Sequence, residues 1–235
     1  MFFKQILSLF PVKMALLVLC SMSLKAQAIY MVTSDIRDTS VTGKIEHFNP
    51  KILSLLSNDN SVLISVRYNE SLVISEYLEN ELSEISMSGI IAKSSNTCTN
   101  LKSNTILEQV ELNDSLYLVE KPLMIDNWEI TGESAVINEK EVMKAVLIEN
   151  KSTLFDKRIF KTVVWYSAEE GVRLGPAQYN GFPGLVVRVE TPMTTYELIS
   201  FEKKQTKDSD CLLEGIILTE EEFKNVRLNL QRTKH

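Results

Sequence analysis

The sequence predicts a mainly β protein: a curved antiparallel sheet, with a half-barrel as one form of it, and an α-helix packed on the sheet at the C-terminal end. Apolar residues recur mostly with period two, as they do in strands that bury one face. The connections between these runs are short, which favours an antiparallel meander over βαβ crossovers. One helix signal stands out, and it lies near the end of the chain.

The runs that have strand composition begin with a hairpin. Residues 61–68 and 71–75 are aliphatic or β-branched and are bracketed by Asn-Asp-Asn and Asn-Glu, which are typical of turns. Further strands are predicted at 105–112, 115–120, 127–130, 142–149, 158–166, 185–190 and 195–201.

The helix is predicted to begin after Thr219. Thr219 and Glu222 have the spacing of a capping box, and three consecutive glutamates occupy the first turn, where the helix dipole favours acids. Phe223, Val226 and Leu230 recur at helical spacing. This narrow apolar stripe indicates a helix that packs one face on the sheet.

Length and composition predict one globular domain behind an export signal. The chain has 235 residues, of which 44% are hydrophobic and 24% charged, enough to bury one sizeable core. Residues 1–28 resemble a secretory signal, with Lys4 and Lys13 before an uncharged stretch at 14–24 and Ala26-Gln27-Ala28 as the cleavage site. We therefore expect a periplasmic or secreted domain at 29–235.

Charge excludes two classes of partner. A membrane anchor of about 20 residues would have to place Lys13 inside the bilayer, so we expect no stable anchor after cleavage. The chain carries 25 basic and 31 acidic residues, a net charge of −6, without a basic cluster. A nucleic-acid interface needs clustered Lys and Arg, so nucleic acid is not an expected partner.

Two cysteines, Cys98 and Cys211, follow the predicted signal. In an oxidising compartment they could form a disulfide. Their spacing carries no information about geometry, and two unpaired buried thiols are an equal alternative.

The segment 171–184, called here the Gly/Pro loop, holds four of the eight glycines and two of the six prolines. Glycine permits positive φ and proline fixes φ, so this loop has a defined shape. One interpretation is a loop that plugs one end of the core. The other is a recognition loop in which Trp165, Tyr179 and Phe182 form an aromatic wall. The candidate binding residues are Trp165, Tyr166, Tyr179, Phe182 and Pro183.

Several motifs follow one another in the second half of the chain. They are Trp128-Glu129-Ile130, Lys144-Ala145, Arg158, Val164-Trp165-Tyr166, Gly175-Pro176, Tyr179 and the hexapeptide GFPGLV at 181–186. In these motifs, over about residues 122–235, the sequence resembles the GLPGLI family of secreted proteins from Bacteroidota.

The resemblance implies a β-rich domain that is secreted or lies in the envelope of a Gram-negative bacterium. Phe182 and Val186 replace the Leu and Ile of the family's hexapeptide conservatively. Met143 lies near the position where many members carry a cysteine, so the resemblance does not imply a disulfide here. The family supplies no catalytic residues, substrate or cofactor.

The search for catalytic residues gives weak candidates. Because His47 and His235 are the two histidines, a multi-histidine metal site is excluded, and we expect no metal and no cofactor. A serine or cysteine nucleophile would need His47 as its base. Glu169 and Glu170 are the weak catalytic candidates, since an acid pair near Trp165 suits sugar chemistry.

We interpret the chain as a non-enzymatic binding or accessory module of the bacterial cell envelope. It would hold an apolar ligand, or an outer-membrane or other envelope protein. One alternative is a carboxylate-based hydrolase of envelope polysaccharide or peptide, which Glu→Gln variants at 169 and 170 would inactivate. The other is a structural subunit of an envelope or secretion complex, which would self-assemble.

Overall fold

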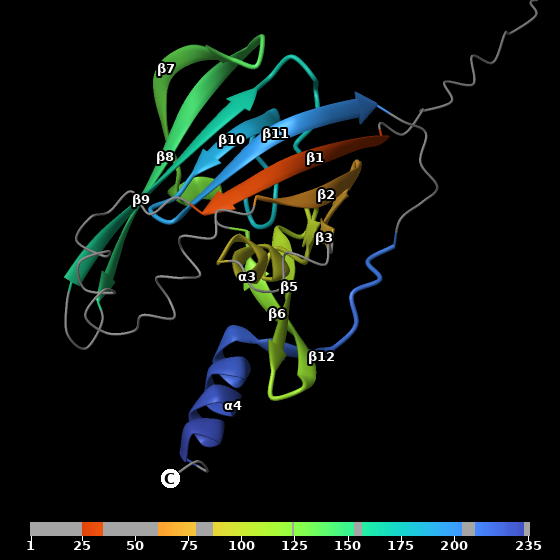
Figure 1. Cartoon of the computed structure of the whole chain (residues 1–235), viewed down its shortest axis with the longest axis vertical. Helices are drawn as coiled ribbons and strands as arrows, with labels where there is room; N and C mark the ends of the chain where they lie inside the picture. The colour runs from red at the N-terminus through yellow and green to blue at the C-terminus, as the bar shows by residue number, and fades with distance from the viewer. Residues whose placement is uncertain are drawn as a thin grey trace, which may run out of the picture.

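The computed structural model describes residues 25–34, 61–78, 87–123, 125–152, 157–203 and 210–232. His47, His235 and most of the predicted signal lie outside these ranges. The protein is mainly β, as predicted, and the described strands form a single twelve-stranded sheet (Figure 1). The described helices are α3 (Met87–Lys93), α4 (Glu220–Arg232) and a 3-10 turn at Ile125–Asn127.

The strands fall into two sets along the chain. The first set is β1 (Lys25–Ser34), β2 (Val62–Asn69), β3 (Leu72–Leu78), β4 (Thr97–Asn100), β5 (Thr105–Leu112) and β6 (Ser115–Pro122). The second set is β7 (Glu129–Ile137), β8 (Lys140–Ser152), β9 (Lys157–Ser167), β10 (Leu185–Glu190) and β11 (Thr194–Lys203). The strand β12 (Ile216–Thr219) comes last.

The sheet order confirms the predicted antiparallel meander, with one exception. Across the sheet the strands run β12-β6-β5-β4-β3-β2-β1-β11-β10-β9-β8-β7. Within each set, consecutive strands are antiparallel neighbours, and β1 joins the two sets by pairing with β11. The exception is β12, which pairs with β6 in parallel. The sheet is open, with β12 and β7 as its two edges.

The strand β1 lies at the centre of the sheet, although its first residues fall within the predicted signal. Ala26, Ala28, Tyr30 and Val32 alternate along it as fully buried side chains. Cleavage after Ala28 would leave β1 as residues 29–34, still paired with both β2 and β11.

The buried side chains of β1 define the inner face of the sheet. Ile64 and Val66 of β2 pair with β1 on this face and are also fully buried. The Tyr30 hydroxyl donates a hydrogen bond to the carbonyl of Val186 on β10 (2.7 Å). This bond satisfies a hydroxyl that burial removes from water, and the same burial raises the pKa of Tyr30 well above its ordinary value.

The C-terminal helix α4 begins with the predicted capping box. The Thr219 amide donates to the Glu222 carboxylate (2.8 Å), and the Glu222 amide donates to Thr219 Oγ1 (3.3 Å). The Thr219 amide and the Thr219 hydroxyl, which also donates to this carboxylate (2.8 Å), hold the pKa of Glu222 below its usual range. The helix packs on the sheet next to β6 and β12, where the Phe223 ring lies 5.5 Å from the ring of Tyr117 (Figure 1).

Candidate functional site

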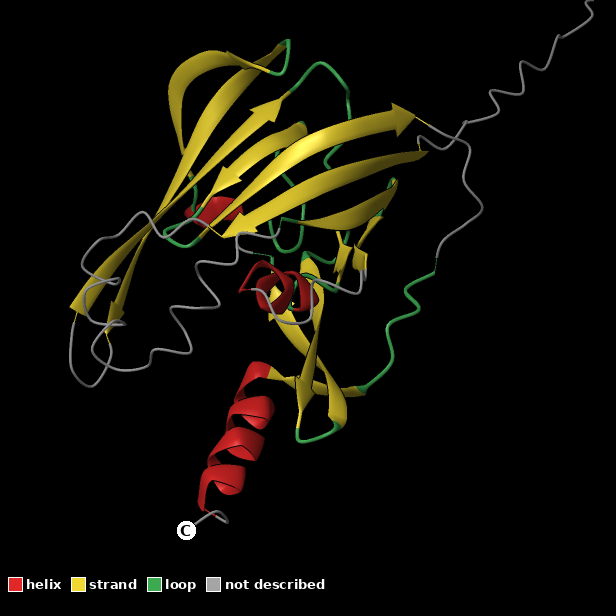
Figure 2. Ribbon diagram, viewed as in Figure 1, coloured by secondary structure: helices red, strands yellow, loops and turns green. Residues whose placement is uncertain are grey.

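The Gly/Pro loop connects β9 to β10 and packs on the inner face of the sheet (Figure 2). Its apolar side chains belong to the core: Leu174 is 0% exposed and Phe182 is 2% exposed. The Phe182 ring stacks on Tyr166 of β9, with centroids 5.6 Å apart, and meets the edge of Trp128 at 5.1 Å. Aromatic packing of this kind fixes the shape of the loop.

The buried side chain of Asn180 hydrogen-bonds to two backbone groups of the loop. Its side chain is 0% exposed, and Oδ1 accepts a hydrogen bond from the amide of Gly175 (2.9 Å). Its Nδ2 donates to the carbonyl of Ala177 (2.6 Å) and to Thr99 Oγ1 on β4 (3.0 Å). One buried side-chain amide therefore satisfies two backbone groups of the loop and also links the loop to β4.

Two further hydrogen bonds fix the tip of the loop. The Ala177 amide donates to Ser75 Oγ on β3 (3.2 Å), and Thr97 Oγ1 on β4 donates to the Ala177 carbonyl (3.1 Å). Ala177 has a φ of 50°, a conformation that a side chain other than glycine adopts at a cost. The bonds from β3 and β4 hold it there.

The structure distributes the predicted binding residues over different environments. The rings of Tyr166, Tyr179 and Phe182 pack in the core, and Pro183 is exposed. Trp165 is partly buried and carries Lys144 Nζ 5.4 Å from its ring centre. Because Trp165 and Tyr166 are neighbours in one strand, their side chains point to opposite faces of the sheet. Phe182 packs on the side of Tyr166, so Trp165 does not form one aromatic wall with Phe182 and Tyr179.

Glu170, one of the two weak catalytic candidates, lies in an ion-pair network. Its carboxylate contacts Lys140 Nζ at 2.6 Å and Lys203 Nζ at 3.2 Å. The hydrogen bond from Lys140, more than any other interaction, holds the pKa of Glu170 below its usual range. A general acid at neutral pH needs the opposite shift, so this environment suits a structural ion pair better than acid catalysis. Glu169, the second candidate, is exposed.

A groove lies beside the loop, between α4 and the inner face of β5 and β6. We call it the β5–α4 groove. Its volume is about 690 Å³, and it combines apolar with cationic side chains: Val110, Val119, Phe223, Lys121, Lys224 and Arg227. Glu108, Glu220 and Glu221 supply acids to the same lining. Both strands and the helix therefore contribute to one surface.

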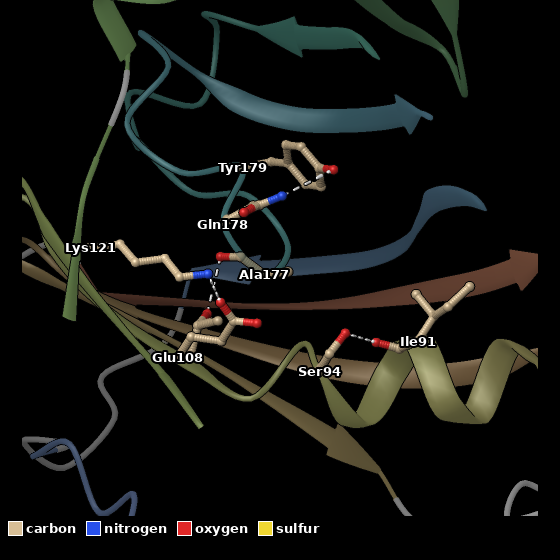
Figure 3. Close-up of polar contacts among 8 residues, drawn as sticks. Ile91, Ser94, Glu108, Lys121, Ala177, Gln178 and Tyr179 are labelled. Carbon is tan, nitrogen blue, oxygen red and sulfur yellow. Dashed lines mark hydrogen bonds and ion pairs between the residues drawn. The ribbon is translucent and has the colours of Figure 1, made fainter. Parts of the chain in front are cut away.

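Glu108 and Lys121, which line the groove, also line a recess that reaches the Gly/Pro loop, and Figure 3 shows both side chains near Ala177 and Gln178 of that loop. Lys121 on β6 forms an ion pair with Glu108 on β5, and both side chains lie next to Gln178 and Tyr179 at the loop's tip. Beyond Lys121, a recess of about 240 Å³ is bounded by Trp128, Tyr179 and other residues. Aromatic and charged side chains line both the groove and this recess, so the whole surface is amphipathic.

The phenols near this recess stay neutral at physiological pH. Burial raises the pKa of Tyr179, and the neighbouring Tyr196 raises it further. Burial also raises the pKa of Tyr196. The Tyr179 hydroxyl accepts a hydrogen bond from Gln178 Nε2 (3.4 Å), so it is positioned as a neutral polar group. Charge in the groove comes from its lysines, arginine and glutamates.

Sequence reasoning named Tyr179, which lines the adjoining recess, as a binding residue, and it missed Glu108 and Lys121. These two residues occupy alternating positions of ordinary strands and match no motif. Their pairing depends on the register that sets Glu108 opposite Val119 and next to Lys121. The signal that could have indicated them is a charged residue at an inward position of each strand of one hairpin.

Metal ligands are not clustered in the part of the chain that the structure describes: no three His, Cys, Asp or Glu side chains there could hold an ion together. Among the same residues, no helix is long and apolar enough to cross a bilayer.

Comparisons with known proteins identify a similar fold. No family model matches the chain, and no curated protein matches it. Among solved structures, one crystal form of PNGF-II matches with 18% sequence identity and a TM-score of 0.51 over 87% of this chain and 33% of that one. A second crystal form matches with 15% identity and a TM-score of 0.54 over 86% and 32%. The chain thus spans about a third of PNGF-II, and this likeness shows the fold alone.

Proposed function

We propose that the protein is a non-enzymatic binding module of the bacterial cell envelope, and that it binds its partner in the β5–α4 groove. Export to the envelope is part of this proposal, and it is supported by the signal-like sequence at 1–28 and by the resemblance to secreted proteins. The observation that carries the proposal is an open groove in which apolar and charged side chains lie together.

The chemistry of the groove favours a protein segment over an apolar ligand. The Gly/Pro loop fills the inner face of the sheet with its own side chains, where an apolar ligand would otherwise be enclosed. In the groove, Phe223 and Val110 instead lie among charged side chains of both signs from α4 and from β5 and β6. A polypeptide can meet such a surface with both an apolar anchor and charges, as protein interfaces do.

Site-specific crosslinking tests this proposal. A photoreactive p-benzoylphenylalanine is introduced at Val110, which lines the groove, in the full chain expressed in its own host. A covalent adduct of defined mass is expected on irradiation, because a bound partner would lie against this position. Mass spectrometry of the adduct then separates a protein partner from an apolar molecule.

The matched control carries the same amino acid at Ile148, which is 57% exposed on β8, away from the groove. It is expected to give no adduct of that mass. Equal adducts at both positions, or none at Val110, would show that the groove is not the binding site.

A further inference from the structure

Cys98 lies on the outer face of the sheet. On β4 it stands between Thr97 and Thr99, whose side chains bond to Ala177 and Asn180 of the loop on the inner face. Side chains alternate along a strand, so Cys98 points the other way. Although it lies on the outer face, Cys98 is only 4% exposed, so other residues cover it there.

Cys211, near the C-terminal end of the chain, lies in a segment that packs on the same outer face as Cys98. The segment 210–215 crosses the outer face on its way to β12, and Gln109 Nε2 on β5 donates a hydrogen bond to its Glu214 carbonyl (2.8 Å). Gln109 is two residues from Leu107, the residue that pairs with Cys98 across β4 and β5, so both lie on the same face. The Gln109 bond therefore brings Cys211 to the face on which Cys98 lies, and burial, followed by the neighbouring Cys211 side chain, raises the pKa of Cys98.

We propose that Cys98 and Cys211 form a disulfide that fastens the segment leading to β12 and α4 onto the sheet. The bond would close a loop of about half the chain, from β4 to the segment just before β12. Because α4 forms one side of the β5–α4 groove, the same bond would also hold that side in place. The inference rests on the placement of both cysteines on the outer face beside β5, and it is independent of the proposed binding function.

The chemistry requires an external disulfide as oxidant, and oxidised glutathione can supply it. The Cys211 thiolate attacks one sulfur of the glutathione disulfide, which forms a mixed disulfide and releases one glutathione thiol. Cys98 then loses its proton, attacks the Cys211 sulfur and displaces the second glutathione. Burial and the neighbouring Cys211 raise the pKa of Cys98, so the partly exposed Cys211 reacts first.

The test uses the full chain after incubation with oxidised glutathione and blocking of remaining thiols with iodoacetamide. We expect oxidation to remove two hydrogens, iodoacetamide to alkylate Cys20 alone, and a non-reducing digest to contain a peptide pair joined through Cys98 and Cys211. Reduction is expected to lower Tm by about 5–15 °C, as for a native disulfide that closes a long loop. A Cys211→Ser variant should have the lower Tm with or without reductant.

Cys20→Ser is the matched control, because it removes the third cysteine and should leave the joined peptides and both Tm values unchanged. Alkylation of both Cys98 and Cys211 after oxidation would overturn the inference. So would a lasting glutathione adduct on Cys211, a bond to Cys20, or the same Tm in the oxidised and reduced protein.

Discussion

Phe182→Ala is expected to lower the free energy of unfolding by about 3–5 kcal/mol, the usual cost of removing a buried aromatic ring. The ring is 2% exposed and lies between Tyr166 and Trp128. Its loss would leave a cavity that these two rings cannot fill without leaving their own contacts. Urea unfolding followed by tryptophan fluorescence measures the change.

The control for this prediction is Pro183→Ala, at the next residue of the same loop. Pro183 is exposed, so its replacement should cost less than about 1 kcal/mol, mainly through greater freedom of the unfolded chain. If both variants had the same urea midpoint of unfolding as the wild type, the loop would not be part of the core. That result would favour the interpretation of the loop as a recognition loop.

Gly175→Ala is expected to be equally severe, with a loss of at least about 3 kcal/mol or failure to fold. A Cβ at this position would overlap the carbonyl oxygen of Tyr179 and lie 2.8 Å from Val186 Cγ2. The Tyr179 carbonyl is backbone, and Asn180 beside it is bonded to Gly175 itself. The collision therefore cannot be relieved by a side-chain rotation.

Gly132→Ala is the matched substitution, because Gly132 has a φ of 75° but nothing within 4 Å of its added Cβ. It should cost about 1–2 kcal/mol from backbone strain alone. Thermal unfolding of the two variants separates these causes. A Gly175→Ala protein as stable as Gly132→Ala would mean that the loop has room to move, contrary to the packing described here.

Most strands were predictable because their side chains alternate. The runs at 105–112 and 185–190 coincide with β5 and β10, and the capping box marks the start of α4. The strand β1 was missed because its first residues read as the end of a signal. The four-residue strands β4 and β12 are too short for alternation to indicate them, and β12 joins β6 in parallel after a long connection.

The site was less predictable than the fold. Composition indicated that the Gly/Pro loop has a defined shape, but not that Asn180 organises it, since a buried amide is recognisable only by its partners. The β5–α4 groove needs the register of β5 and β6 and the docking of α4, and both depend on contacts between distant residues. The placement of Cys211 on the same face as Cys98 also depends on contacts between distant residues.

Native mass spectrometry of the full chain, recovered gently from its own envelope fraction, tests the central claim of groove binding most directly. We expect a stoichiometric partner on the wild-type protein that is lost from the Lys224→Glu, Arg227→Glu variant, which reverses the charge along the groove. A Lys93→Glu, Lys161→Glu variant makes the same change in net charge at exposed positions outside the groove, and it should retain the partner. A bare chain in all three preparations, or a partner kept equally by all three, would contradict binding in the β5–α4 groove.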